Sequence, residues 1–227
     1  EVAYEGYLHA GTLTTLAIFD KPDPLAGPYF EETIYVTPSR LEPQVQEKIR
    51  QRVQQACDAY GLTTGPVHAE LRVNEGEAWI LEVASRTIGG DCGRTLDTGE
   101  GLNLETLAIS LATGQPVSPE PVQGARGVMM IPIPGAGLLR RVEGLSSARK
   151  IPHISNISLA IADGHELVPL PEGNQYPGYI FAEAEDPGTV IDALRNAHAQ
   201  LKFVLAPLWK IDAATLDGVG KTPANRI

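Results

Sequence analysis

Hydrophobic and polar residues alternate along residues 67–73 and again along residues 78–83, a pattern that predicts two β-strands. In both segments the odd-numbered positions are apolar: Val67, Ala69, Leu71 and Val73 in the first, and Trp79, Leu81 and Val83 in the second. The intervening residues 74–77 (Asn-Glu-Gly-Glu) form turns readily, so we expect a β-hairpin. If both apolar sets share one face, pairing across this turn places Glu70 directly opposite Glu82.

The rest of the first half combines extended and helical patterns. Strands are predicted at residues 1–9, 12–19 and 32–37. Ser39 is the expected cap of a helix whose apolar positions, Cys57 among them, recur at helical spacing until Gly61 ends it. A second helix is predicted over residues 103–113.

The pattern changes at residues 115–124, which contain three prolines and are typical of a linker. Beyond it we expect strands near 126–133, 137–143, 156–162 and 178–184, and a helix over 187–203. The predicted fold class is therefore α+β. The predicted organisation is a first domain over residues 1–115, a linker over 116–124, a smaller α+β domain over 125–207 and a tail over 208–227.

Composition and charge limit the classes of function. The 227 residues are 43% hydrophobic, enough for one or two cores. A formal charge of −10 argues against a surface that binds nucleic acid or anionic membranes. The two cysteines, Cys57 and Cys92, match neither a zinc site nor a disulfide framework. The sequence shows no apolar run of membrane-spanning length and no signal peptide, so the cytoplasm is the expected compartment.

The predicted hairpin carries the candidate chemistry. Side chains directly across an antiparallel pair lie about 5 Å apart, where the like charges of Glu70 and Glu82 repel unless a cation lies between them. Mg²⁺ prefers oxygen ligands and is commonly held by one or two carboxylates together with phosphate oxygens. Arg86, four residues after Glu82, could grip the same phosphate through two hydrogen bonds. The alternative is a hairpin with an ordinary solvated polar face, which the spacing alone favours.

The stretch from Gly65 to Gly90 resembles the metal-binding hairpin of the ATP-grasp superfamily: a Gly-x-x-His/Asn-x-Glu strand, a turn, and a strand that ends in Glu-x-Asn-x-Arg. Residues 1–6, 18–22 and 30–39 are similar to the same ligases, and residues 124–206 resemble, more loosely, their small C-terminal domain. The resemblance implies the C-terminal half of an ATP-grasp domain, an antiparallel sheet with packed helices, followed by a smaller α+β domain.

The resemblance also implies roles for individual residues. Glu70 and Glu82 would bind the Mg²⁺ (or Mn²⁺) ions that bridge the phosphates of ATP, and Arg86 would contact the nucleotide and stabilise the transferring phosphate. Ala84 stands where the family has Asn, which removes one metal ligand. The resulting Glu-x-Ala-x-Arg sequence, followed by Gly-Gly, looks like the branch of carboxylate–amine (L-amino acid) ligases.

Several further residues are candidates with an ordinary structural alternative. Lys21 and Glu32 (with its neighbour Glu31) lie where related ligases line the substrate side, or else form a solvated turn and an edge strand. Gly89 and Gly90 are expected to allow a ligand close to the backbone, or else to form a plain turn. Arg94 could meet a substrate carboxylate or be an exposed loop residue. His68 is expected to orient Glu70 or to contact solvent.

Taken with the resemblance, the hairpin predicts a fragment of an ATP-dependent ligase that joins a carboxylate and an amine, both small molecules, through an acyl phosphate. Because the family's lysines, glycine-rich lid and adenine hinge are not in this sequence, we expect the missing N-terminal part of the same enzyme to be needed for activity; a homodimer is also compatible. Two alternatives stay open. One is a carboxylase or carbamoyl-phosphate-synthase-like enzyme that uses bicarbonate, and the other is a degenerate binding module.

Overall fold

A computed structural model describes residues 1–24, 29, 31–96, 103–119 and 122–208. Eight strands form a large sheet: β1 (Val2–His9), β2 (Thr12–Asp20), β3 (Ile34–Thr37), β4 (Gly65–Asn74), β5 (Glu77–Ala84), β6 (Ala125–Met130), β8 (Ile154–Leu159) and β10 (Gly178–Ala184). Three form a small sheet: β7 (Gly137–Glu143), β9 (Glu166–Leu167) and β11 (Lys202–Ala206). The helices are α1 (Pro43–Tyr60), α2 (Leu104–Thr113), α3 (Leu145–Ala148), α4 (Pro187–His198) and the short 3-10 helix η1 (Cys92–Leu96).

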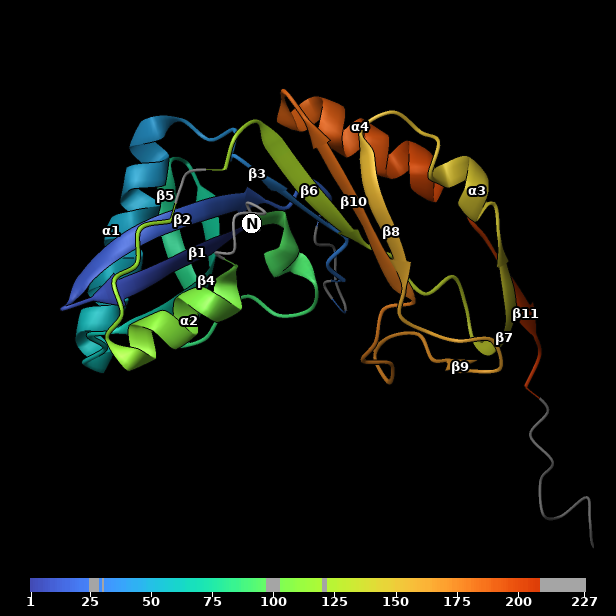
Figure 1. Ribbon diagram of the computed structural model, residues 1–227, viewed down its shortest axis with the longest axis horizontal. Coiled ribbons are helices and arrows are strands. Elements are labelled where there is room, and N and C mark those ends of the chain that lie inside the picture. Colours follow the sequence, from blue (N-terminus) through green and yellow to red (C-terminus); the bar gives the residue numbers. More distant parts are fainter. Residues whose placement is uncertain (25–28, 30, 97–102, 120–121, 209–227) are drawn as a thin grey trace, which may run out of the picture.

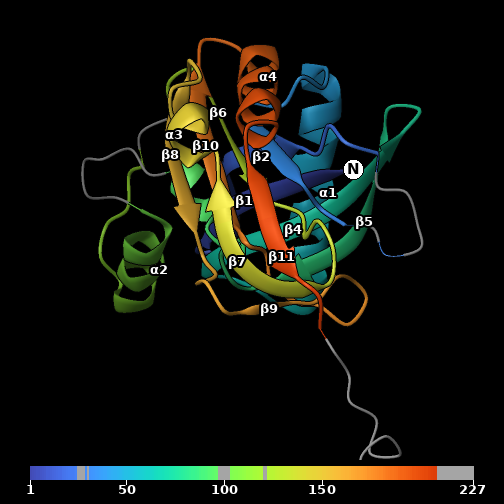
Figure 2. The same ribbon diagram turned by 90° about the vertical axis from the view of Figure 1, so that its right-hand side faces the viewer.

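The large sheet extends through most of the molecule, and the small sheet lies at its far end (Figure 1). The order of the large sheet is β5-β4-β1-β2-β3-β6-β10-β8, and that of the small sheet is β11-β7-β9. Every strand pairing in the described part of the chain is antiparallel. Figure 2 shows the small sheet from its own side. These features confirm the predicted α+β class.

The large sheet continues across the expected linker, because β3 pairs with β6. Strands on both sides of residues 116–124 therefore belong to one sheet. The division into a first domain, a linker, a second domain and a tail stays a prediction. Residues 120–121 of the linker and 209–227 of the tail lie outside the described residues.

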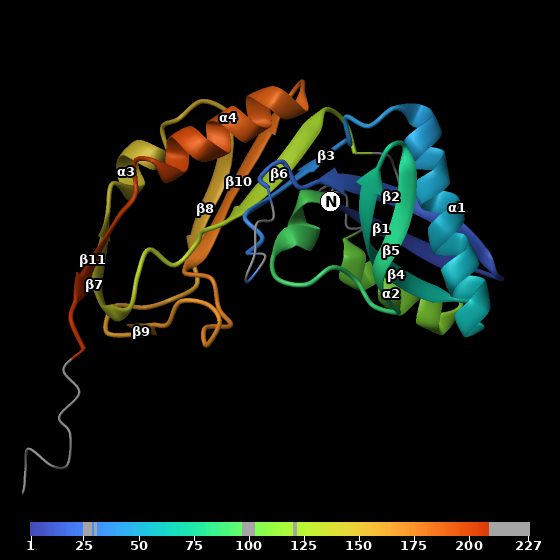
Figure 3. The same cartoon turned by 180° about the vertical axis from the view of Figure 1, so that it is seen from behind.

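Helices cover the two faces of the large sheet differently. On one face α1 packs over β1, β4 and β5, and α4 packs over β6, β8 and β10 (Figures 1 and 3). On the other face η1 and α2 contribute to an apolar cluster with residues of β1, β2, β3, β6 and β10. Gly127 allows α4 to approach β6 closely, because a Cβ atom there would lie 2.7 Å from Val190 Cγ1. None of the described helices combines the length and apolarity needed to cross a membrane.

Two predicted helix boundaries are wrong. Ser39 does not cap α1; its hydroxyl donates to Asp20 at 2.6 Å, and the N-cap is Glu42, followed by Pro43, which needs no partner for a backbone N–H. The helix predicted over 187–203 ends at His198, because residues 202–206 pair with β7 as strand β11. The other end of α1 agrees with the sequence, since Gly61 adopts a left-handed conformation with φ of 70°.

The β4–β5 hairpin has the predicted pairing at its centre but not along its whole length. Glu70 pairs with Glu82, as expected, yet the register shifts beside it, so that Leu71 pairs with Ile80 and Leu81 is the extra residue of a β-bulge. Between the bulge and the turn, Ala78 and Ile80 therefore point toward the core, and Trp79 points away from it. Trp79 and Leu81 are 63% and 50% exposed, so their predicted inward orientation is wrong.

The bulge predicts a contrast between two leucines of one hairpin. Leu71→Ala should lower the free energy of unfolding by about 2–5 kcal/mol, because Leu71 is fully buried and its truncation leaves a cavity. Leu81→Ala should change it by only about 0.5 kcal/mol or less, since this side chain is half exposed. Urea unfolding of the chain and both variants measures the two values, and equal losses would contradict the observed register.

Candidate active site

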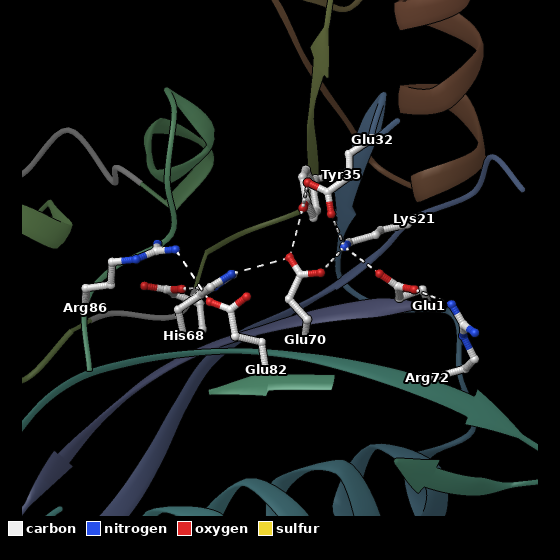
Figure 4. A network of polar contacts seen from close by, with 10 residues as sticks. Glu1, Lys21, Glu32, Tyr35, His68, Glu70, Arg72, Glu82 and Arg86 are labelled. Atoms are coloured by element: carbon white, nitrogen blue, oxygen red, sulfur yellow. Dashed lines mark hydrogen bonds and ion pairs between the residues drawn. The ribbon is translucent and has the colours of Figure 1, made fainter. Parts of the chain in front are cut away.

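Two rows of paired residues cross β1, β4 and β5 on the face that also carries η1. The first row is Ala3, Glu70 and Glu82, and the second is Glu5, His68 and Ala84. Residues paired directly across antiparallel strands point to the same side of a sheet, so Glu70 and Glu82 share one face. Figure 4 shows these two carboxylates beside each other, with His68 and Arg86 next to them.

Lys21, which directly follows β2, lies at the centre of a cluster of carboxylates (Figure 4). Its Nζ lies 3.1 Å from Glu1 Oε1, 2.5 Å from Glu32 Oε1 and 2.6 Å from Glu70 Oε2. The same nitrogen is 5.1 Å from the centroid of the Tyr35 ring. Only 2% of the Lys21 side chain is exposed, so these contacts replace water around its charge.

The buried charges in this cluster stabilise one another. Burial disfavours the charged form of Lys21, but hydrogen bonds to Glu32 and Glu70 outweigh this effect and raise its pKa. Burial also acts to raise the pKa of Glu70, whereas hydrogen bonds from His68 and Lys21 act more strongly and lower it to about 2. Both groups are therefore charged at neutral pH without any bound ion.

His68 is buried between two carboxylates. Its Nδ1 lies 3.1 Å from Glu5 Oε2, and its Nε2 lies 3.5 Å from Glu70 Oε1. Burial disfavours the imidazolium ion, but hydrogen bonds with Glu5 and Glu70 more than compensate and raise the pKa of His68 to about 9. Burial raises the pKa of Glu5, against hydrogen bonds from His68 and from the Ile88 N–H. His68 thus contacts Glu70, the first of its two expected alternatives.

Arg86 and Glu82 form the open side of the site. Arg86 Nη2 lies 3.9 Å from Glu82 Oε1, and Arg86 Nη1 donates to the Thr87 carbonyl at 2.9 Å. Their side chains are 56% and 63% exposed. Glu70, whose side chain is 18% exposed, lies deeper in the same sheet face, where Lys21 and His68 neutralise its charge. Glu82 and Arg86 are therefore the exposed groups of the site that can contact a ligand.

The oxygen donors fit a hard divalent cation. Glu1, Glu32 and Glu70 each offer a carboxylate oxygen, and these oxygens lie within 4.8 Å of one another. Glu82 faces Glu70 from the neighbouring strand and is exposed. Both oxygens of Glu70 already have partners, Lys21 on Oε2 and His68 on Oε1. A cation that bound Glu70 would compete with these two groups.

The remaining predicted residues lie at different distances from this cluster. Lys21 and Glu32 belong to it. A Cβ atom on Gly89 would lie 3.8 Å from Arg86 Nη1, which is an ordinary van der Waals distance. A Cβ atom on Gly90 would lie 3.2 Å from the Tyr179 hydroxyl, which is a tight contact. Arg94 lies apart: its guanidinium is 4.7 Å from the Phe181 ring centroid.

Arg94 lines a separate cavity of about 240 Å³ between η1 and the strands β6, β8 and β10. Arg126, Asn156 and Glu183 also line this cavity. Arg94 also forms an ion pair with the neighbouring Asp91, at 3.4 Å.

Sequence reasoning did not single out Glu1, Glu5 or Tyr35. Glu5 is fully buried, and the Tyr35 hydroxyl donates to Glu32 at 2.7 Å and lies 3.3 Å from Glu70. One signal was available for Glu5. It is an acidic residue within a strand whose other positions are mostly apolar, and such a residue needs buried partners.

Comparison with known proteins places both halves of the chain in described families. Residues 1–95 match the ATP-grasp domain, and residues 129–206 match the L-amino acid ligase C-terminal domain 2. Alanine–anticapsin ligases are 28% (Bacillus subtilis) and 30% (Bacillus amyloliquefaciens) identical over 111 residues, which are 48% of this chain and 23% of each relative.

Solved structures show the same fold. The chain resembles an L-amino acid ligase from Bacillus licheniformis with a TM-score of 0.78 and 24% identity, over 90% of this chain and 51% of that one. It resembles phosphoribosylglycinamide synthetase from Anaerococcus prevotii with a TM-score of 0.74 and 17% identity, over 90% and 53%. The chain thus spans about half the length of these two structures.

The fold, the paired glutamates and the first match identify an ATP-grasp domain over residues 1–95. Residues 129–206 match a domain of L-amino acid ligases, and the chain spans about half the length of the L-amino acid ligase structure that it resembles.

The charges around His68 predict how stability depends on pH. The pKa of about 9 in the folded chain exceeds the ordinary value of 6.5, so protonated His68 stabilises the fold fully below pH 6.5, and this contribution is lost as the pH rises through about 9. Urea unfolding in EDTA should therefore show stability falling between pH 6.5 and 9, and falling less in His68→Gln. The exposed His165→Gln variant should keep the original pH dependence. An unchanged slope in His68→Gln would contradict this assignment.

Proposed function

We propose that this chain is part of an ATP-dependent ligase that joins a carboxylate to an amine through an acyl phosphate. The observation that carries the proposal is the direct pairing of Glu70 with Glu82 on one face, with Arg86 beside Glu82. The match of residues 129–206 to a domain of L-amino acid ligases supports an amine as the second substrate. The alanine–anticapsin ligases among the relatives support the same class of reaction.

Each residue has a role that follows from its surroundings. Glu70 and Glu82 would hold Mg²⁺ or Mn²⁺, which when bound neutralises the charge of the ATP phosphates. Arg86 is exposed enough to reach the transferring phosphate and can grip two of its oxygens at once. Lysine at this position would keep the charge but lose the bidentate contact.

The reaction itself requires no covalent bond to the protein. A carboxylate oxygen of the substrate attacks the terminal phosphorus of ATP, ADP leaves, and the amine then attacks the acyl carbon and releases phosphate. The chain contributes by positioning these groups and by neutralising charge. Lys21 and Glu32, beside Glu70, are proposed to line the substrate side.

An enzyme that uses bicarbonate is the second candidate. Its support is the shared fold, since biotin carboxylase domains also resemble the chain, with TM-scores of 0.64 and 12–16% identity. Ala84, which stands in the second row where that class has Asn, weighs against it. We therefore prefer the amine ligase.

The complete ligase should release phosphate from ATP when it is given pooled amino acids, with a matching amide product by mass spectrometry. Glu82→Gln should lower kcat by about a hundredfold or more, because one charged ligand of the metal is removed. Glu77→Gln is the matched control: this glutamate lies on the same strand, pairs with Lys48 at the surface, and should leave turnover unchanged. Normal turnover in Glu82→Gln would refute the metal site, and turnover only with bicarbonate would favour the second candidate.

The 227 residues alone should bind ATP weakly and catalyse no turnover. The reason is that Glu82 and Arg86 are more than half exposed, so a nucleotide resting on them would be covered on one side only. Titration calorimetry of this chain with ATP and Mg²⁺ tests this expectation. Micromolar affinity would show that the described face is sufficient for binding.

A further inference from the structure

Glu5 is an acidic residue in the middle of a buried strand. None of its surface is exposed, and the neighbouring positions of β1 are also buried. Burial of a carboxylate is costly unless each oxygen has a hydrogen-bond partner, and here each oxygen has one. Oε2 lies 3.1 Å from His68 Nδ1, and Oε1 accepts a hydrogen bond from the Ile88 N–H at 3.1 Å.

The two hydrogen bonds of Glu5 connect it to two segments that carry candidate site residues: β4, with His68 and Glu70, and the segment after β5, with Arg86 and Ile88. Ile88 follows Arg86 by two residues and precedes Gly89, so its N–H ties the segment after β5 to the centre of the sheet. His68 lies between Glu5 and Glu70, with its other nitrogen 3.5 Å from Glu70. Glu5 itself is two residues away from the first row and is not paired with either metal-binding candidate.

The packing around Ile88 shows what the hydrogen bond adds. The Ile88 side chain is 8% exposed and lies in the apolar cluster with Ala3 and Cys92, which holds the segment against the sheet. Apolar contacts are not directional, whereas a hydrogen bond from the backbone fixes the rotation of the peptide. Arg86 is more than half exposed, so its direction depends on the backbone that carries it.

We propose that Glu5 is a positioning residue: it anchors the Arg86–Gly90 segment through the Ile88 N–H and holds His68 behind Glu70, so that Arg86 and Glu70 face the same phosphate. This inference rests on the proposed ligase function. A buried ion pair that contributes only to stability can be replaced by apolar residues at little cost. The Glu5 carboxylate, in contrast, joins β4 at His68 to the Arg86–Gly90 segment at Ile88.

Hydrogen exchange of the Ile88 amide tests the anchor directly and needs no substrate. In Glu5→Ala the protection of this amide should fall by about tenfold or more, because an acceptor with a charge is lost. In Glu5→Gln protection should largely remain, since the amide oxygen can still accept the bond. The amides of Met129 and Ile180, which belong to a different apolar cluster, serve as the internal check that each variant is folded. Unchanged protection of Ile88 in Glu5→Ala would overturn the proposal.

Kinetics of the complete ligase test the consequence for the reaction. Glu5→Ala should lower kcat by about tenfold to a hundredfold with the KM for ATP changed little, and Glu5→Gln should restore most of the loss. Glu77→Gln again serves as the control. Equal kcat in Glu5→Ala and the unmodified ligase would overturn the positioning role. If the unmodified ligase shows no ATP-dependent turnover, the proposed function fails, while the hydrogen-exchange result still decides whether Glu5 anchors the segment.

Discussion

Compensation of buried charge is the constraint on which the candidate site depends. Lys21 is almost completely buried, and its ammonium group is stable there only because three carboxylates surround it. His68 is held in the same way between Glu5 and Glu70. Glu70 belongs to both groups, so its orientation is fixed from two sides before any ligand arrives. Such preorganisation is what a site needs if it is to stabilise charge without rearranging.

The hairpin shows how much of the site the sequence could reveal. Alternation of apolar and polar residues, together with a turn, was sufficient to pair Glu70 with Glu82, because register follows from these local features. The bulge at Leu81 left no such signal, and so the orientation of Trp79 was predicted wrongly. An inserted residue in a strand changes no composition and only becomes visible when both partners are placed.

Other parts of the fold depend on contacts between distant segments. Glu5 lies in β1, and Lys21 directly follows β2. Both strands are buried on both faces over much of their length, and periodicity cannot indicate a preferred side for such strands. Residues 202 and 203 belonged to the predicted helix, yet they pair with β7 as the start of β11. Tertiary pairing thus overrode the local preference of this segment. The family resemblance supplied the chemistry that the residue pattern alone left open.

The bulge at Leu81 also affects how the molecule presents itself to other chains. Strand β5 is at the end of the large sheet in the part of the chain that the structure describes, and an outermost strand has backbone groups available for pairing. The bulge adds Trp79 and Leu81, two large apolar side chains, to that edge. Its twist interrupts a regular pairing surface, but the exposed indole remains. This edge is therefore a place where chains can associate at high protein concentration, and Trp79→Lys is a substitution that would discourage such association.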